Sequence, residues 1–260
     1  MTQERLRTAA ARLDAAGIED PVREARILLA AVPDRFEDAI TRRCTHEPAA
    51  YIMGHREFWS LDFEVSPAVL IPRPDSETLI ETALKELKSN PPKTILDLGT
   101  GSGCLLIALL TEWRDATGVG VDISPAALAI AKRNAERLGV SGRTQFIQAD
   151  FGELSGNCFD LVVANPPYIP DAVVDTLDSD VRDFEPHLAL KGGSDGLGPL
   201  ERIARSLFDC MNPNALAFIE IGYDQGQSAP RTLRDQGLKV LRVIKDLGHN
   251  DRVVVVKLPS

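Results

Sequence analysis

Hydrophobic residues recur along this chain first with a helical period and later in a mixed pattern of strands and helices. Over the first fifty or so residues, apolar positions three and four apart predict helices. Gly17 ends the first of them, and Asp20-Pro21 gives the second a capping side chain and a first-turn proline. The pattern predicts a small bundle with helices over 2–16, 21–31, 33–43 and 48–53.

The pattern changes over residues 56–71, where aromatic and β-branched side chains predict a β-hairpin around Ser66-Pro67. The following Pro72-Arg73-Pro74 segment is stiff and extended, because each proline fixes its own backbone angle. An amphipathic helix then runs to about Lys88. We expect a linker whose polar tip, Arg73, faces another part of the protein.

From Thr94 onward, short apolar runs alternate with amphipathic stretches. This alternation predicts right-handed crossovers and an α/β fold with a doubly wound, mostly parallel sheet. The short turn near Asp246–Asp251 predicts that the last two strands pair antiparallel at an edge. Strands are expected over 94–97, 119–122, 144–148, 159–164, 216–221, 239–244 and 252–257, with helices over 102–112, 125–139, 199–211 and 225–236.

Composition excludes several classes of function. With 260 residues, 44% of them apolar, the chain can bury a large core. A net charge of −9 without any basic run argues against a large nucleic-acid footprint. Four cysteines and four histidines are dispersed, so we expect no metal site and no disulfide framework. No apolar leader or membrane-length run is seen, and the protein is expected in the cytoplasm.

A glycine-rich turn follows the first strand of the expected sheet, in Asp97-Leu98-Gly99-Thr100-Gly101-Ser102-Gly103. Glycines let the backbone approach a ligand and aim amides at it. The dinucleotide fingerprint needs a further glycine at position 104, and this chain has Cys104. Asp97 would also repel a pyrophosphate, whereas a cationic ligand would tolerate it.

Two further acids end strands of the expected sheet: Asp122, suited to bind two ribose hydroxyls, and Asp150. The pattern resembles the S-adenosylmethionine site of class I methyltransferases. The resemblance implies glycines beneath the amino-acid and ribose portions, Asp122 on the ribose, and Asp150 with Phe151 near the adenine, leaving S-adenosylhomocysteine as product. The cofactor-binding residues so expected are Asp97, Gly99, Thr100, Gly101, Ser102, Gly103, Asp122, Asp150, Phe151 and Asn165.

The apolar run 161–164 stops on Asn165-Pro166-Pro167-Tyr168, where two prolines forbid both ladder and helix. Read alone, this tetrapeptide could simply end a strand. It resembles the motif of methyltransferases that act on planar, sp² nitrogens. The Asn165 side-chain oxygen and the Pro166 carbonyl can each accept one N–H of an –NH₂ group, and Tyr168 gives a flat wall. Two acceptors orient the nitrogen for attack and stabilise its developing charge.

The flanking segments resemble the HemK family, the glutamine methyltransferases of peptide chain release factors. They are Glu57-Phe58-Trp59, Pro72 to Glu77, Glu185 to Leu190, Gly192 to Leu197, and Glu220-Ile221-Gly222. The resemblance implies that the acceptor is N5 of the glutamine in a Gly-Gly-Gln loop. Catalytic roles then fall to Asn165, Pro166 and Tyr168, while Asn165, Pro166, Pro167, Tyr168 and Arg73 contact the substrate.

The same resemblance divides the chain. We expect a helical substrate-docking domain over residues 1–54, a hairpin and Pro-Arg-Pro linker over 55–78, and an S-adenosylmethionine-dependent domain over 79–260. The expected partner is a release factor, with no direct nucleic-acid or membrane contact, and the protein is expected to be a monomer.

Two rival functions use the same residues. An adenine-N6 or cytosine-N4 nucleic-acid methyltransferase would need a basic groove and a target-recognition segment for the flipped base, and the sequence offers neither. A cofactor-binding module without catalysis would not need the intact Asn165.

Overall fold

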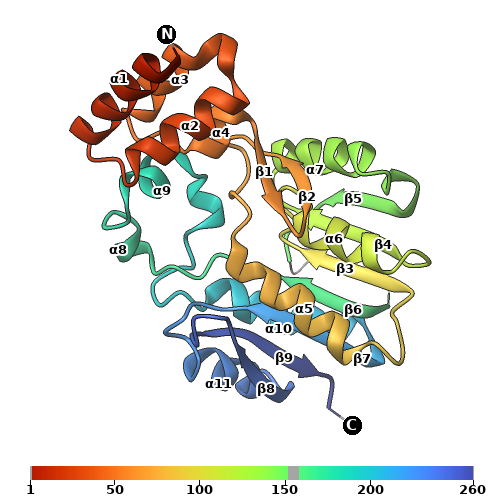
Figure 1. The fold of residues 1–260 in the computed structure, drawn as a ribbon. Helices are drawn as coiled ribbons and strands as arrows, with labels where there is room; N and C mark the ends of the chain where they lie inside the picture. The colour runs from red at the N-terminus through yellow and green to blue at the C-terminus, as the bar shows by residue number, and fades with distance from the viewer. Residues whose placement is uncertain (1, 152–157, 260) are drawn as a thin grey trace.

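The computed structural model describes residues 2–151 and 158–259, which form a helical N-terminal part beside a large α/β part (Figure 1). The N-terminal helices share a core of their own, which includes Leu13, Leu28 and Phe36. The Asp20 carboxylate accepts the Arg23 backbone N–H, as its capping position predicts. The helices are α1 (Thr2–Ala15), α2 (Pro21–Ala31), a 3₁₀ turn (Pro33–Arg35), α3 (Phe36–Arg43) and α4 (Ala49–Met53).

A two-stranded hairpin and a linker join the two parts. Strands β1 (His55–Phe58) and β2 (Leu61–Glu64) pair antiparallel around a two-residue turn, Trp59-Ser60. Both turn residues have positive φ, so the turn is of the kind that glycine or asparagine usually provides. Carboxylates hold it instead: Glu77 accepts the Trp59 N–H at 2.8 Å, and Glu57 accepts the Ser60 N–H at 2.7 Å.

The hairpin predicted around Ser66-Pro67 is therefore wrong in its position. Val69 to Ile71 form no strand, because side chains satisfy their backbone groups: the Tyr51 hydroxyl donates to the Val69 carbonyl, and Glu185 accepts the Ile71 N–H. A 3₁₀ turn (Pro74–Ser76) then leads into α5 (Glu77–Glu86). Phe58 is fully buried and packs edge-on against Phe63, which favours core packing for this hairpin.

The large sheet has seven strands in the order β5-β4-β3-β6-β7-β9-β8, and all neighbours are parallel except those of β9. This confirms the predicted fold class. The last two strands do pair antiparallel, but β9 inserts between β7 and β8, so of these two strands only β8 lies at an edge of the sheet. The strands are β3 (Thr94–Leu98), β4 (Thr117–Asp122), β5 (Thr144–Gln148), β6 (Phe159–Ala164), β7 (Met211–Glu220), β8 (Lys239–Lys245) and β9 (Asp251–Lys257).

Helices cover both faces of the sheet (Figure 1). Alternate residues of the central strands supply the two cores: Leu161 and Val163 face the first group of helices, whereas Val162 and Ala164 face the second. The first group is α5, α6 (Cys104–Glu112) and α7 (Pro125–Arg137), and the second is α10 (Gly198–Cys210) and α11 (Ser228–Asp235). No helix in the described residues is long and apolar enough to cross a bilayer.

A long connection after β6 returns over the carboxyl ends of the strands, toward the N-terminal helices (Figure 1). It contains α8 (Asp171–Val174), α9 (Ser179–Phe184) and a 3₁₀ turn (His187–Ala189). Ion pairs bind it to the bundle, because the Arg43 guanidinium lies 2.9 Å from Asp180 on α9 and 3.0 Å from Glu24 on α2. The connection therefore forms one wall of the space above the sheet.

One buried side chain ties the hairpin to the glycine-rich turn. The Asn134 side-chain oxygen accepts the Glu64 N–H at 2.7 Å, and its amide nitrogen donates to the carbonyls of Glu64 and Ser102 at 3.0 and 2.9 Å. Asn134→Ala should lower the free energy of unfolding by about 2–4 kcal/mol, since backbone groups of two segments lose their partner. Urea unfolding measures this. The exposed Asn90→Ala is the control and should change stability by less than about 0.5 kcal/mol.

Candidate functional site

Four polar or small residues stand in one row where neighbouring strands leave the sheet. In the observed register, Leu98 pairs with both Val121 and Ala164, and Ala164 pairs with Ile219. The residues one step further along are Asp122, Gly99, Asn165 and Glu220, in the order β4, β3, β6 and β7. Because Gly99 has no side chain, a gap opens between Asp122 and Asn165.

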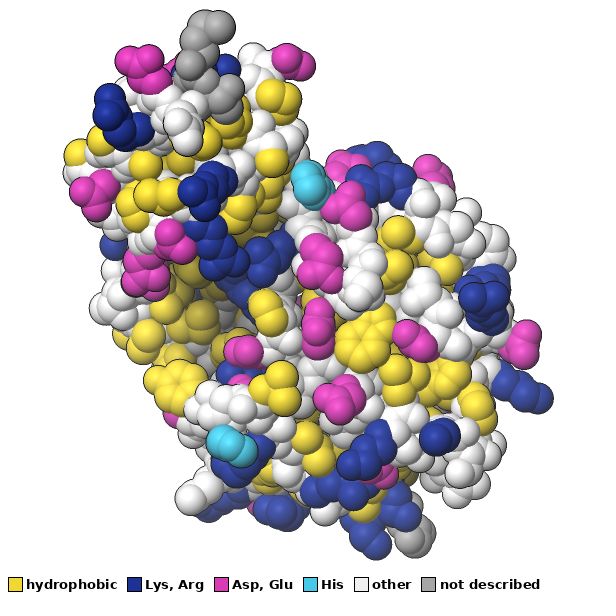
Figure 2. Space-filling view, viewed as in Figure 1, with side chains coloured by type: hydrophobic (Ala, Val, Ile, Leu, Met, Phe, Trp, Pro, Cys, Tyr) yellow, Lys and Arg dark blue, Asp and Glu magenta, His cyan; other side chains and the backbone are white. Residues whose placement is uncertain are grey.

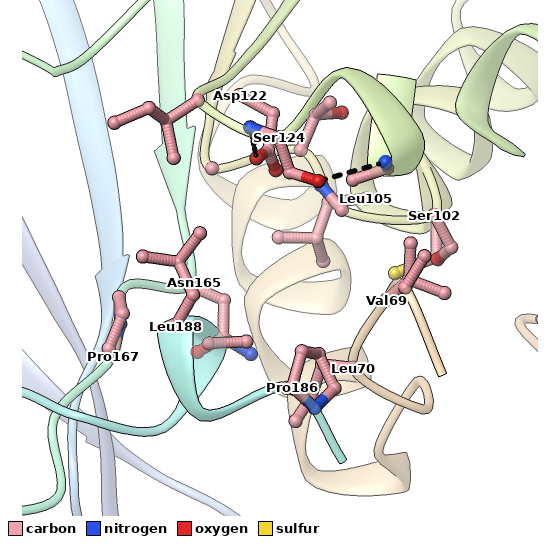
Figure 3. Close-up of a pocket in the computed structure, with 18 of the residues that line it drawn as sticks. Val69, Leu70, Ser102, Leu105, Asp122, Ser124, Asn165, Pro167, Pro186 and Leu188 are labelled. Atoms are coloured by element: carbon pink, nitrogen blue, oxygen red, sulfur yellow. Dashed lines mark hydrogen bonds between the residues drawn. The ribbon is translucent and has the colours of Figure 1, made fainter. Parts of the chain in front are cut away.

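A cavity of about 220 Å³ lies above this row. Figure 3 shows Asp122, Ser124, Asn165, Pro167, Pro186 and Leu188 around it, contributed by strand ends, α7 and the connection after β6. Figure 2 shows the same face of the molecule hollowed between the N-terminal helices and the sheet. Of the residues predicted from sequence, the cavity brings together Gly99, Thr100, Gly101, Ser102, Asp122, Asp150, Phe151, Asn165, Pro167 and Arg73.

The remaining four predicted residues, Asp97, Gly103, Pro166 and Tyr168, do not line the cavity. Gly103 instead lets α6 and α7 approach, because a Cβ there would lie 3.3 Å from the Ala131 Cβ on α7. Tyr168 packs beside the cavity, and its carbonyl accepts the Gln225 side-chain amide at 3.2 Å.

The glycine turn is held by the acid that follows β4. Asp122 accepts the Gly101 N–H with one carboxylate oxygen and the Ser124 N–H with the other, both at 2.9 Å. Gly101 has φ +54, and a Cβ there would meet only the Gly99 carbonyl, at 4.0 Å. Burial raises the pKa of Asp122, against the hydrogen bonds from these amides. Each carboxylate oxygen keeps a lone pair that can accept a ligand hydroxyl.

Asp97 lies beneath the turn and is only 1% exposed. Its Oδ2 accepts the Thr100 hydroxyl at 2.7 Å, while Oδ1 has no hydrogen-bond partner among the described residues. Burial raises the pKa of Asp97 to about 7, although the Thr100 hydrogen bond opposes the rise. A buried carboxylate with unused acceptor capacity favours a positively charged ligand nearby and disfavours an anion.

A polar and aromatic edge closes the cavity beyond Asp122. The Phe151 ring lies against Gly99, where an added Cβ would come within 3.3 Å of it. The Arg202 guanidinium stands 5.6 Å from the centre of the Phe151 ring and pairs with Asp150 at 3.1 Å. Arg202 was not predicted from the sequence, because its helix α10 follows the third acid by some fifty residues and carries no motif.

The linker forms another wall of the cavity. Glu185, in the connection after β6, holds it in place, although no role was predicted for this residue. Glu185 is 4% exposed, accepts the Ile71 N–H at 3.2 Å and pairs with the Arg73 guanidinium. Burial raises the pKa of Glu185, and the charge of Arg73 opposes the rise. The motif that begins at Glu185 was the feature of the sequence that could have indicated a role for this residue.

Asn165 reaches the cavity from the end of β6, and its Nδ2 donates to the Ser76 hydroxyl at 3.2 Å. Tyr168 lies just beyond, and burial raises the pKa of its hydroxyl to about 12. The Tyr168 side chain is therefore neutral at physiological pH. The arrangement can present the Asn165 oxygen as a hydrogen-bond acceptor to a small planar group in the cavity, with the uncharged Tyr168 ring beside it.

Comparison with known proteins identifies relatives over nearly the whole length. A family described as a methyltransferase domain matches residues 89–193. The release factor glutamine methyltransferase of Caulobacter vibrioides is 40% identical over 270 residues, covering 95% of this chain and 93% of that protein. The protein of that name from Moorella thermoacetica is 41% identical over 266 residues, covering 94% of each.

Solved structures with the same fold are more distant. The hMettl16 catalytic domain in complex with MAT2A 3′UTR hairpin 1 has a TM-score of 0.62 and 15% identity, covering 91% of this chain and 94% of that one. The ribosomal protein L11 methylase of Lactobacillus delbrueckii subsp. bulgaricus has a TM-score of 0.53 and 18% identity, covering 75% and 84%. At such low identity, these likenesses concern the fold alone.

The raised pKa of Asp97 predicts how stability depends on pH. The folded protein holds this proton up to about pH 7, whereas the unfolded chain releases it near its ordinary pKa of 3.8. The contribution of Asp97 is therefore fully favourable below that value and is lost as the pH rises through 7. Asp97→Asn should reduce this loss, raising the free energy of unfolding at pH 8 relative to the native chain.

Asp160 provides a control of opposite sign. Burial tends to raise its pKa, but hydrogen bonds from Lys93, Asn212 and Thr94 lower it overall. Asp160→Asn should therefore destabilise the protein at neutral pH, with the difference vanishing as the pH falls below the lowered pKa. Urea titrations from pH 3 to 8 on both variants check the pair. If both substitutions changed the free energy of unfolding in the same direction above neutral pH, the electrostatic explanation would be contradicted.

Proposed function

The chain belongs to the family of release factor glutamine methyltransferases, and from that premise we propose that it methylates N5 of the glutamine in the Gly-Gly-Gln loop of peptide chain release factors, with S-adenosylmethionine as methyl donor. The observation that carries the proposal is the setting of Asn165. It ends a central strand, lines the cavity, and has its amino group tied to Ser76, which leaves its oxygen available as an acceptor.

The residues around the glycine turn fit S-adenosylmethionine. Space above Gly101 accommodates a ligand close to the backbone, and Asp122 keeps lone pairs for ribose hydroxyls. Asp97, with its unpartnered buried oxygen, suits a molecule that carries positive charge. Phe151 and Arg202 offer flat surfaces for an adenine, beside Asp150. When bound, the cofactor would supply an electrophilic methyl group on a sulfonium sulfur.

The Asn-Pro-Pro-Tyr segment then acts on the glutamine side chain. The Asn165 oxygen and the Pro166 carbonyl each accept one N–H of the amide, which fixes its plane and directs the nitrogen into the cavity. As the nitrogen bonds to the methyl carbon and the carbon–sulfur bond breaks, positive charge grows on the nitrogen, and the two acceptors stabilise that charge by roughly 3–4 kcal/mol for each group. The nitrogen then loses one proton after the transfer. Tyr168 stays neutral and packs beside the cavity, while Pro167 and Arg73 border the entrance.

We further propose that residues 1–54 dock the release factor, residues 55–78 serve as linker, and residues 79–260 carry catalysis. The N-terminal helices support this division, since they have a separate hydrophobic core. The Arg43–Asp180 ion pair joins the bundle to the connection that walls the cavity. A release factor that contacts the bundle would therefore lie beside the entrance to the site. Docking predicts a much higher kcat/KM for an intact factor than for a short Gly-Gly-Gln peptide.

Incubation with radiolabelled S-adenosylmethionine tests the substrate directly. A purified release factor should take up one methyl group at the glutamine of its Gly-Gly-Gln loop, and a factor with alanine at that position should take up none. Parallel reactions contain DNA and RNA of matched mass. Label in nucleic acid with none in the release factor would favour the adenine or cytosine alternative and overturn the proposal.

Two variants separate cofactor binding from methyl transfer. Asn165→Ala should lower kcat by about 100-fold or more, because one of two acceptors is lost, while the cofactor Kd changes little. Asp122→Ala should raise the cofactor Kd about tenfold or more, since it removes ribose acceptors and frees the Gly101 amide. Calorimetry and single-turnover kinetics distinguish the two effects. The roles would be disproved if both variants lost cofactor affinity equally.

A further inference from the structure

Glu220 is a buried carboxylate that the proposed reaction leaves unused. It ends β7, is 1% exposed, and its Oε2 has no hydrogen-bond partner among the described residues. A buried carboxylate without full pairing is costly to keep, so its position calls for a compensating role.

The strand register sets Glu220 beside Asn165. Strands β6 and β7 are parallel and pair Ala164 with Ile219, so the next residue on each strand, Asn165 and Glu220, leaves the sheet at the same level. Ser76 lies between the linker and these strand ends, with its hydroxyl on the Asn165 amino group. Ser76 and Asn165 both act on the Glu220 carboxylate as hydrogen-bond donors that lower its pKa. Three buried or half-buried polar groups thus meet at one point behind the cavity.

The chemistry of these groups dictates their direction. An ionised carboxylate only accepts hydrogen bonds, and an asparagine amide carries donors on its nitrogen and an acceptor on its oxygen. Glu220 must therefore face the Asn165 nitrogen, as does Ser76, which accepts from it at 3.2 Å. Both anchors lie on the donor end of the amide. The acceptor end of the amide, Oδ1, therefore faces the cavity that Asn165 lines and can accept a hydrogen bond from a ligand there.

We propose that Glu220, together with Ser76, is a positioning residue that fixes the flip of the Asn165 amide, so that Oδ1 and not the amino group meets the acceptor nitrogen of the substrate. The inference rests on the proposed function, because only a substrate that donates N–H needs an acceptor there. Without the anchor, the two orientations of the amide would compete. An Asn165 amino group turned into the cavity would face another –NH₂ group and could not accept from it.

The groups around Glu220 permit this role and make the ionisation of its carboxyl sensitive to pH. Asp75 on the 3₁₀ turn, Arg252 on β9, Tyr168 after β6 and Cys104 on α6 are the charged and titratable groups that interact with it. Arg252 is shared, since it also lies 3.1 Å from Asp75 and 3.0 Å from Asp246. Its positive charge is therefore only partly available to Glu220.

Burial raises the pKa of Glu220 to about 7, opposed by the hydrogen bond from Ser76 and the charge of Arg252. Below that pH the carboxyl is protonated and becomes a hydrogen-bond donor. A donor at this point competes for the Asn165 oxygen and weakens the anchor. Methyl transfer should therefore decline as the pH falls through the Glu220 pKa.

The test compares Glu220→Ala, Glu220→Gln and Ser76→Ala in the full chain, with a Gly-Gly-Gln substrate and S-adenosylmethionine. Glu220→Ala should lower kcat about 30- to 100-fold and Ser76→Ala about tenfold, with the cofactor Kd unchanged within about twofold. Glu220→Gln keeps one acceptor oxygen and should recover kcat to within about tenfold of the native enzyme. Its kcat should also lose the inflection near pH 7, which separates Glu220 from Asp97, the other acid of similar pKa.

Ser206→Ala is the matched control for Ser76→Ala, because both serines are buried, at 3% and 2% exposure, and the Ser206 hydroxyl donates to the Ile203 carbonyl of its own helix. Its kcat should equal that of the native chain. A readout free of turnover is the ¹⁵N spectrum of the Asn165 side-chain amide. Its two protons should exchange slowly with solvent in the native protein and rapidly in Glu220→Ala.

The outcomes are separable. A native enzyme that does not methylate the glutamine would disprove the proposed function and this inference with it. A native enzyme that does, with kcat in Glu220→Ala within twofold of its own, would overturn only the positioning role. Glu220→Ala could also lose kcat because it binds the cofactor more weakly or is unfolded at the assay temperature. If the exchange of the Asn165 amide protons were then unchanged, the positioning role would likewise be contradicted.

Discussion

The parallel register of four adjacent strands is the constraint on which the site depends. Strands β4, β3, β6 and β7 end at one level, so the residues one step beyond the positions that pair these four strands with one another form a single row. Both faces of the sheet are buried, and a slip by one residue would turn each strand's core side chains to the opposite face. The hydrophobic cores thus determine where Asp122 and Asn165 stand. Gly99, between them, contributes only space.

The walls of the cavity come from segments that lie far apart in the chain, and buried side chains connect them. Tyr51 of α4 donates to Val69, and Glu185 holds Ile71 and Arg73. The N-terminal helices, the linker and the connection after β6 are therefore linked through backbone groups that would otherwise lack partners. This explains why residues 69–71 form no strand although their composition favours one.

Local patterns predicted the strands and the glycine turn, and the resemblance of the motifs indicated the family, which the relatives confirm. The hairpin was misplaced because its turn, Trp59-Ser60, lacks the glycine or asparagine that marks such turns, and carboxylates distant in sequence stabilise it. The insertion of β9 between its neighbours is a long-range pairing that no local pattern encodes. Glu185 is part of a motif, but its role in holding the linker could not be predicted, because it depends on contacts with residues far away in the sequence.

The distribution of buried acids gives the site its preference among ligands. Asp97 lies beneath the glycine turn and Glu220 lies beside Asn165, and burial raises the pKa of both. Arg252 offsets part of the charge near Glu220, whereas the largest effects on Asp97 come from burial and the Thr100 hydroxyl. Once ionised, the two acids would give the strand ends a negative potential that repels a pyrophosphate and attracts positive charge. We infer that this field serves two steps at once, because a cationic donor must bind and positive charge must then develop on the acceptor nitrogen beside Asn165.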